Sequence, residues 1–148
     1  MGPLTAKENP TYKDVCSGST GHVEVYDFEF TSTSGDSNAT YESLVKFFFQ
    51  FHDPTIFNAQ EQDTGPQYAS VIYAYTPEQA DIAKKVIKEV QTFLDKGLIP
   101  TYRGTQVTTD VRQATIFYPA HEEHQEYLDK DPSGYCNHRY RIKTWPTL

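Results

Sequence analysis

The chain has few of the residues on which small, cross-linked proteins depend. Of its 148 residues, two are cysteine, one is methionine and one is tryptophan. Two cysteines are too few for a disulfide framework and are typical of a reducing compartment, so we expect a cytoplasmic protein. No apolar signal segment follows Met1, and no apolar run approaches the roughly 20 residues that span a bilayer. The sequence therefore indicates neither secretion nor a membrane partner.

Basic residues are also in the minority. The formal net charge of −7 argues against binding a nucleic-acid backbone, because that binding depends on clusters of lysine and arginine. Aromatic residues, by contrast, are abundant: eleven tyrosines and nine phenylalanines predict a core or a pocket lined with rings. The length suits one domain that buries a core without metals or disulfides. We predict a mobile N-terminal tail over residues 1–8 and a single domain over residues 9–148.

Strand and helix patterns alternate along the chain. A strand is predicted where apolar residues alternate, and a helix where they recur every three or four residues. Thr76-Pro77-Glu78-Gln79 is the clearest helix start, with a threonine cap, proline at the first position and a glutamine that completes a capping box. The expected elements are, in order, a strand over His22–Phe30, a helix capped by Thr40 and ending before Pro54, a long loop over Asp53–Pro66, a strand over Ala69–Tyr75, a helix between Thr76 and Gly97, a strand over Thr105–Val111 and a helix over Ala120–Lys130.

This order predicts an α+β fold, a two-layer sandwich of helices on a sheet. Glu24 stands on the same strand face as Tyr26, Phe28 and Phe30 in this prediction. Desolvation by the rings should raise the pKa of its carboxyl, which would then keep a proton to donate. The alternative is a glutamate at the end of a strand that reaches solvent.

Three blocks of sequence resemble the peptide methionine sulfoxide reductase A family. The first is Asn9-Pro10-Thr11-Tyr12, Val15-Cys16-Ser17-Gly18 and Thr20-Gly21-His22-Val23-Glu24. The second is His52-Asp53-Pro54-Thr55 with Asn58, Gln60, Asp63, Gly65 and Gln67-Tyr68. The third is Phe117-Tyr118, Ala120, His124-Gln125, Tyr127-Leu128, Lys130, Pro132 and Gly134-Tyr135-Cys136. The resemblance implies the family's ferredoxin-like α/β sandwich, without its first strand and helix, and hence a sheet edge covered by the tail or by a second subunit in a homo-oligomer.

The resemblance also implies an active site. In the family, the positions matching Tyr12, Glu24 and Tyr68 bind and protonate the sulfoxide oxygen, and the position matching Asp63 belongs to the same network. Two phenols and a carboxylic acid suit this task, because a sulfoxide oxygen is a strong acceptor whose charge grows as the sulfur is attacked. Four further residues are expected to contribute to substrate binding: His22, Tyr26, Gln67 and His124.

The nucleophile of the family, the cysteine of a Gly-Cys-Phe-Trp-Gly motif, is absent from this sequence. Cys16 matches a family position that is not the nucleophile, and we interpret it as a small buried residue. Cys136 matches a position that resolves the oxidised nucleophile, so both cysteines are candidate redox thiols. The surrounding loop also departs from the family, with Glu61 in place of a preferred glycine and Pro66 and Ala69 in place of threonine and arginine.

Three functions stay open on this basis. The first is cofactor-independent acid–base chemistry, such as cyclisation, lactonisation or isomerisation of a small oxygen-bearing substrate, with Glu24 as the acid or base. The second is binding of methionine sulfoxide or a similar ligand without reduction, and the third is a truncated reductase. No cofactor is expected. His121 and His124 stand three apart, but no further ligand pattern accompanies them, so we expect a solvated acidic helix and not a metal site.

Overall fold

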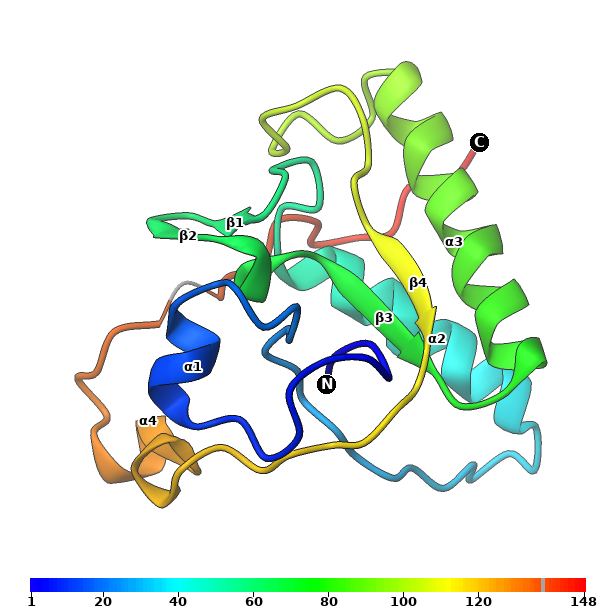
Figure 1. Cartoon of the computed structure of the whole chain (residues 1–148). Helices are drawn as coiled ribbons and strands as arrows, with labels where there is room; N and C mark the ends of the chain where they lie inside the picture. The colour runs from blue at the N-terminus through cyan, green and yellow to red at the C-terminus, as the bar shows by residue number, and fades with distance from the viewer. Residues whose placement is uncertain (137) are drawn as a thin grey trace.

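The computed structural model describes residues 1–136 and 138–148. Two helices, α2 (Ser37–Phe51) and α3 (Pro77–Asp95), pack against each other and hold most of the core between them. α3 also lies along a pair of strands, β3 (Val71–Ala74) and β4 (Asp110–Gln113), as Figure 1 shows. Helices packed on a small sheet make an α+β fold, as the sequence predicts.

The two helices begin where their caps dictate. Thr76 Oγ1 accepts a hydrogen bond from the Gln79 backbone at 3.2 Å, so the predicted start of α3 is confirmed. Helix α2 begins earlier than predicted, because Asp36, not Thr40, is its cap: Asp36 Oδ1 accepts from Ala39 N at 2.9 Å. Thr40 lies inside the helix, where its hydroxyl donates a hydrogen bond to the carbonyl of Asp36.

The core is made of aliphatic and aromatic side chains from both helices and from the last residues of the chain. Phe49, Val86, Val90 and Phe93 have no exposed surface. Tyr102 donates its hydroxyl to the Phe49 carbonyl, and burial raises the pKa of this phenol. The other buried members of the cluster are Val45, Ile99 and Ile142. Trp145 packs edge-on against Phe93, with 5.6 Å between ring centroids, and donates its indole N–H to Glu89 at 3.0 Å.

The strands β3 and β4 run parallel, with Val71 opposite Asp110 and Ala74 opposite Gln113. A parallel pair needs a crossover connection, and α3 supplies it. The predicted strand over Ala69–Tyr75 is confirmed in β3, whereas the predicted strand over Thr105–Val111 is shifted towards the C-terminus, to Asp110–Gln113. A separate antiparallel hairpin is formed by β1 (Ala59–Gln60) and β2 (Asp63–Thr64), which lie inside the predicted long loop.

The predicted strand over His22–Phe30 was wrong. The structure has no strand there, because its backbone pairs only briefly with other segments: Val23 exchanges hydrogen bonds with Met1, and Glu24 N donates to the Gln67 carbonyl at 2.9 Å. Tyr26 is 86% exposed and stacks on Phe28, so the alternation of rings does not mark a buried face.

The start of the chain is anchored, although the sequence predicts a mobile tail. Met1 is 6% exposed, and its carbonyl accepts hydrogen bonds from Val23 N at 2.8 Å and from the Tyr73 hydroxyl at 3.3 Å. The carbonyl of Gly2 accepts from Thr115 Oγ1 at 2.6 Å. The first two residues therefore lie against the β3 side of the molecule, as Figure 1 shows.

The predicted helix over Ala120–Lys130 is broken in two. A 3₁₀ turn, η2 (Glu122–His124), and a short helix, α4 (Tyr127–Lys130), flank Glu126, whose φ of +52° lies in the left-handed region. Such a conformation cannot continue a right-handed helix. α4 lies beside the first helix, α1 (Tyr12–Cys16), in Figure 1.

Candidate active site

Helix α1 is short, and its N-terminus is closed by side chains. Thr11 Oγ1 accepts from Asp14 N at 3.3 Å, and the Asp14 carboxylate accepts from Thr11 N at 2.8 Å, which is a complete capping box. Lys7 Nζ lies 2.7 Å from the same carboxylate. The hydrogen bonds from Lys7 and Thr11 hold the pKa of Asp14 well below its usual range. This cap fixes the helix that carries Tyr12 and Cys16.

Removal of the cap should loosen α1 without unfolding the core. We expect Thr11→Ala to cost the helix about 1 kcal/mol, because Asp14 N loses its acceptor. Amide hydrogen exchange over residues 12–16 should accelerate, whereas the thermal midpoint of the whole chain should change little. Thr33→Ala, at an exposed loop position, is the matched control and should leave this exchange unchanged. Equal exchange rates in the two variants would contradict the role of the cap.

Gln67 joins three segments behind this helix. It belongs to a 3₁₀ turn, η1 (Pro66–Tyr68), and is 5% exposed. Its side-chain Nε2 donates to the carbonyl of Cys16 at 3.4 Å, and its backbone carbonyl accepts from Glu24 N at 2.9 Å. Gln67 thus brings the end of α1, the segment that carries Glu24 and the turn that carries Tyr68 to one place.

The carboxyl of Glu24 has a raised pKa. Desolvation by the surrounding protein is the main cause, and the negative charge of Asp63 adds to it, whereas His124 opposes it. The residue as a whole is nevertheless exposed, so the predicted burial against Tyr26, Phe28 and Phe30 was wrong and the carboxyl is accessible to a ligand from outside. A raised pKa means that the carboxyl holds its proton to a higher pH than an ordinary glutamate does.

The two phenols share the electrostatic environment of Glu24. The pKa of Tyr68 is raised, first by desolvation and then by the charges of Glu24 and Asp63. The pKa of Tyr12 is raised as well, first by a hydrogen bond with the Cys16 side chain and also by the proximity of Tyr68 and Glu24. Both phenols therefore stay protonated at neutral pH and are hydrogen-bond donors.

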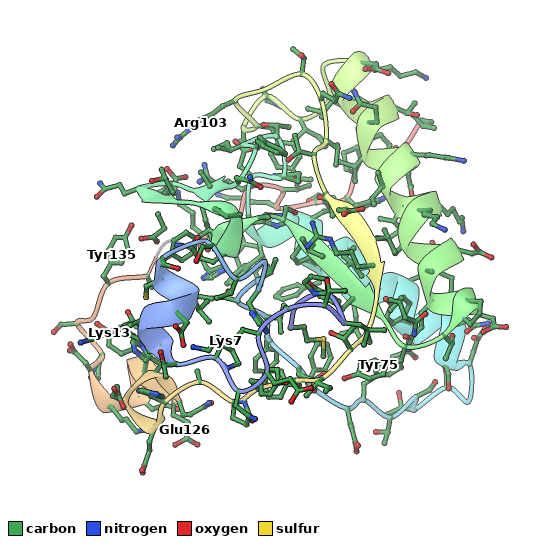
Figure 2. All side chains as sticks on the ribbon, in the orientation of Figure 1. Lys7, Lys13, Tyr75, Arg103, Glu126 and Tyr135 are labelled. Atoms are coloured by element: carbon green, nitrogen blue, oxygen red, sulfur yellow. The ribbon has the colours of Figure 1, made fainter. Side chains whose placement is uncertain are left out.

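His124 completes the arrangement from the other end of the chain. Its ring stacks on that of Tyr12, with 4.9 Å between centroids and 19° between planes, and His121 lies 6.0 Å from the same ring. Figure 2 shows the side chains around α1 and α4, with Lys13 and Glu126 labelled on this side of the molecule. The structure thus brings together five side chains from separate segments, here called the acid cluster: Tyr12, Glu24, Asp63, Tyr68 and His124.

The acid cluster offers several proton donors on an accessible surface. Tyr12 is 47% exposed, and Asp63 and Tyr68 are half-buried. Two phenols, together with a carboxyl whose pKa is raised, suit an oxygen atom that carries partial negative charge. A hollow of about 300 Å³ lies elsewhere, beside β3 and β4, and residues of the acid cluster do not line it.

Comparison with known proteins decides the family. Residues 4–147 match the family described as peptide methionine sulfoxide reductase. The chain belongs to the peptide methionine sulfoxide reductase family. The sequence-based recognition of the family is therefore confirmed over nearly the whole chain.

Curated members of this family come from distant organisms. A probable peptide methionine sulfoxide reductase of Schizosaccharomyces pombe is 40% identical over 134 residues, which cover 90% of this chain and 71% of that protein. Peptide methionine sulfoxide reductase MsrA of Pasteurella multocida is 42% identical over 88% of this chain and 68% of its own length. The mitochondrial peptide methionine sulfoxide reductase of Bos taurus is 43% identical over 86% of this chain. The chain spans 51% of the bovine protein.

Solved structures of reductases share the fold. Mxr1 from Saccharomyces cerevisiae in reduced form superposes with a TM-score of 0.73 at 32% identity, over 96% of this chain and 74% of that one. Methionine sulfoxide reductase A of Corynebacterium diphtheriae gives a TM-score of 0.68 at 34% identity, over 88% of this chain and 61% of the other. The expected sandwich fold of the reductase family is confirmed.

Two predicted substrate-binding residues, Tyr26 and His22, have different surroundings. Tyr26 is largely exposed and stacks on Phe28, with 5.2 Å between ring centroids. His22 is 5% exposed, contacts Tyr118 edge-on at 5.8 Å and lies against Gly2, where an added Cβ would be 2.8 Å from the ring. Burial lowers the pKa of His22, so it stays neutral at physiological pH. His22 therefore packs against the start of this reductase-family chain, whereas Tyr26 is a surface ring.

The thiols occupy different surroundings. Cys16 is exposed and hydrogen-bonds the Tyr12 side chain, which corrects its interpretation as a small buried residue. Its place at the last turn of α1, four residues after Tyr12, is the signal that could have revealed this neighbour. Cys136 is also exposed, with its Sγ 3.8 Å from Nδ1 of His138.

Among the residues that the structure describes, no three side chains of His, Cys, Asp or Glu gather as metal ligands. Within residues 1–136 and 138–148, no helix is both long and apolar enough to cross a membrane.

Proposed function

We propose that the acid cluster binds the oxygen of methionine sulfoxide and donates a proton to it. Protonation of this oxygen is one part of the sulfoxide reduction for which the family is named. The observation that carries this proposal is that the charge of Glu24 raises the pKa of both Tyr12 and Tyr68, and that Tyr68 also raises the pKa of Tyr12. This influence requires the three side chains to lie close together, although they come from separate segments.

The chemistry follows from the donors. The two phenols donate hydrogen bonds to the S=O oxygen, and Glu24 donates the proton that the oxygen needs as its bond to sulfur breaks. Asp63 favours the protonated form of Glu24 by its negative charge, whereas His124 opposes it. Reduction to the thioether also consumes two electrons, which thiols supply in pairs as they form a disulfide, and the oxygen leaves as water.

Binding can be tested separately from reduction. Titration calorimetry with the S epimer of N-acetyl methionine sulfoxide amide should give heat at millimolar ligand, and the corresponding thioether should give much less. Tyr12→Phe and Tyr68→Phe should each weaken binding roughly two- to tenfold, the worth of one neutral hydrogen bond. Tyr75→Phe is the matched control, because Tyr75 is exposed, donates to Asp27 at 2.9 Å and is labelled away from α1 in Figure 2. Equal binding of sulfoxide and thioether would refute the proposal.

A second candidate is cofactor-independent acid–base catalysis on another small oxygen-bearing substrate, which the raised pKa of Glu24 favours. It requires Glu24 but neither thiol. A chain with Cys16→Ser and Cys136→Ser should keep such an activity in full, whereas any thiol-dependent reduction of the sulfoxide would be lost. Turnover that disappears with the thiols excludes this candidate.

A further inference from the structure

Glu61 occupies a position that favours glycine. It is the first residue of the two-residue turn between β1 and β2, where Gln60 pairs with Asp63, and its φ is +57°. Turns of this kind need positive φ, which glycine adopts without strain and residues with a Cβ adopt at a cost. A glutamate at this position therefore calls for an interaction that offsets the strain.

Three arginines surround the Glu61 carboxylate. Oε2 lies 2.5 Å from Nη2 of Arg103, and Oε1 lies 3.1 Å from Nη2 of Arg139 and also contacts Nη2 of Arg141. The side chains of Glu61 and Arg141 are only 14% and 11% exposed. Charges screened from water interact more strongly than surface pairs, so this group is a firm attachment.

The attachment holds the C-terminal segment on the hairpin. Gln60 Nε2 lies 2.9 Å from Nε2 of His138, and the His138 ring stacks on Phe51 at 5.3 Å and 14°. The backbone of Arg141 donates to the Gln50 carbonyl at 2.7 Å. The loop that carries Arg103, labelled in Figure 2, is joined to the same region by Arg103 N, which donates to Asp53 at 2.9 Å.

The other strand of the hairpin leads directly to the acid cluster. Asp63 is the first residue of β2, opposite Gln60, and Tyr68 follows in η1 after Gly65, whose N–H donates to the Asn58 carbonyl at 2.8 Å. A shift of the hairpin would move both residues. We propose that Glu61 is a positioning residue, which sets Asp63 and Tyr68 of the acid cluster by clamping the hairpin to the C-terminal arginines. This inference rests on the proposed sulfoxide binding.

The test compares Glu61→Gln and Glu61→Gly with Glu42→Gln, which removes an ion-paired carboxylate on α2. Sulfoxide affinity, measured with the S epimer described above, should fall roughly two- to thirtyfold in both Glu61 variants. The pH at which binding is lost should also move down, because Asp63 would no longer raise the pKa of Glu24 as strongly. This second readout separates positioning from a general loss of stability. Parental affinity and an unchanged pH midpoint in Glu61→Gln would overturn the inference.

Amide hydrogen exchange tests the clamp independently of the ligand. Exchange over residues 59–68 and 138–141 should accelerate in Glu61→Gln and stay unchanged in Glu42→Gln. Arg139→Gln, which removes one exposed partner, should give a smaller effect of the same kind if the Glu61 variants do not fold. If the parent chain binds no sulfoxide, the proposed function fails, and unchanged exchange would then still overturn the clamp.

Discussion

Sulfoxide binding by the parent chain should weaken about tenfold for each pH unit above the pKa of Glu24. Only the protonated carboxyl donates to the S=O oxygen, and the carboxylate repels it. Because desolvation and Asp63 raise the pKa of Glu24, the loss begins at a higher pH than for an ordinary glutamate. Glu24→Gln keeps a donor but no ionisable proton, so its affinity should be independent of pH over the same range. Calorimetric titrations from pH 4 to pH 9 measure both curves.

Two checks separate this effect from unfolding. Glu122→Gln replaces an exposed glutamate of η2 and should keep the parental pH curve. A raised folded pKa makes the stability contribution of Glu24 fall as pH rises from the ordinary value through the raised one, so Glu24→Gln should melt no lower than the parent at neutral pH. A Glu24→Gln variant that retains the full pH dependence would rule out Glu24 as the proton donor.

Phe49→Ala should lower the free energy of unfolding by about 3–5 kcal/mol. Its ring has no exposed surface and packs in the core between α2 and α3. Truncation to alanine therefore leaves a cavity in this cluster. The loss is a large part of the stability of a typical domain, about 5–15 kcal/mol. Urea unfolding measures it directly, and the thermal midpoint should fall by roughly 6–20 °C.

The matched control is Phe57→Ala, because Phe57 is 74% exposed. Its effect on the free energy of unfolding should stay within about 0.5 kcal/mol. Similar losses in both variants would show that the core does not lie between α2 and α3 as described.

Local signals predicted the start of helix α3 well. The cap, the proline and the apolar stripe of α3 act within one turn of the chain, so the sequence alone places its start at Pro77. The grouping of Tyr12, Glu24, Asp63 and Tyr68 as one site came from the family resemblance. In the structure, Asp63 raises the pKa of Glu24, and Glu24 raises the pKa of both phenols. Spacing alone could not have joined Tyr12 and Glu24 to Asp63 and Tyr68, which lie 39 to 56 positions further along the chain, since that depends on tertiary packing.

The sequence-based predictions were wrong for the strand over His22–Phe30, the final helix and the burial of Cys16. Alternating rings over His22–Phe30 predicted a strand, but a strand also needs a backbone partner along its length. The backbone hydrogen bonds that this segment makes to other segments, with Met1 and Gln67, lie at one end of it. The prediction of one continuous final helix was wrong because the backbone of Glu126 is left-handed and divides it. The usual burial tendency of cysteine predicted a buried Cys16, and no local pattern indicated that this residue of α1 is exposed.

The position of Trp145 has a practical consequence. It is the only indole in the chain, and it packs on Phe93 beside Glu89 and Lys46 of the two long helices. Its fluorescence is therefore an intrinsic optical probe of the α2–α3 interface, sensitive to melting of the core. Ligand binding at the acid cluster can be followed separately by calorimetry. Folding and ligand binding can therefore both be measured on the unlabelled protein.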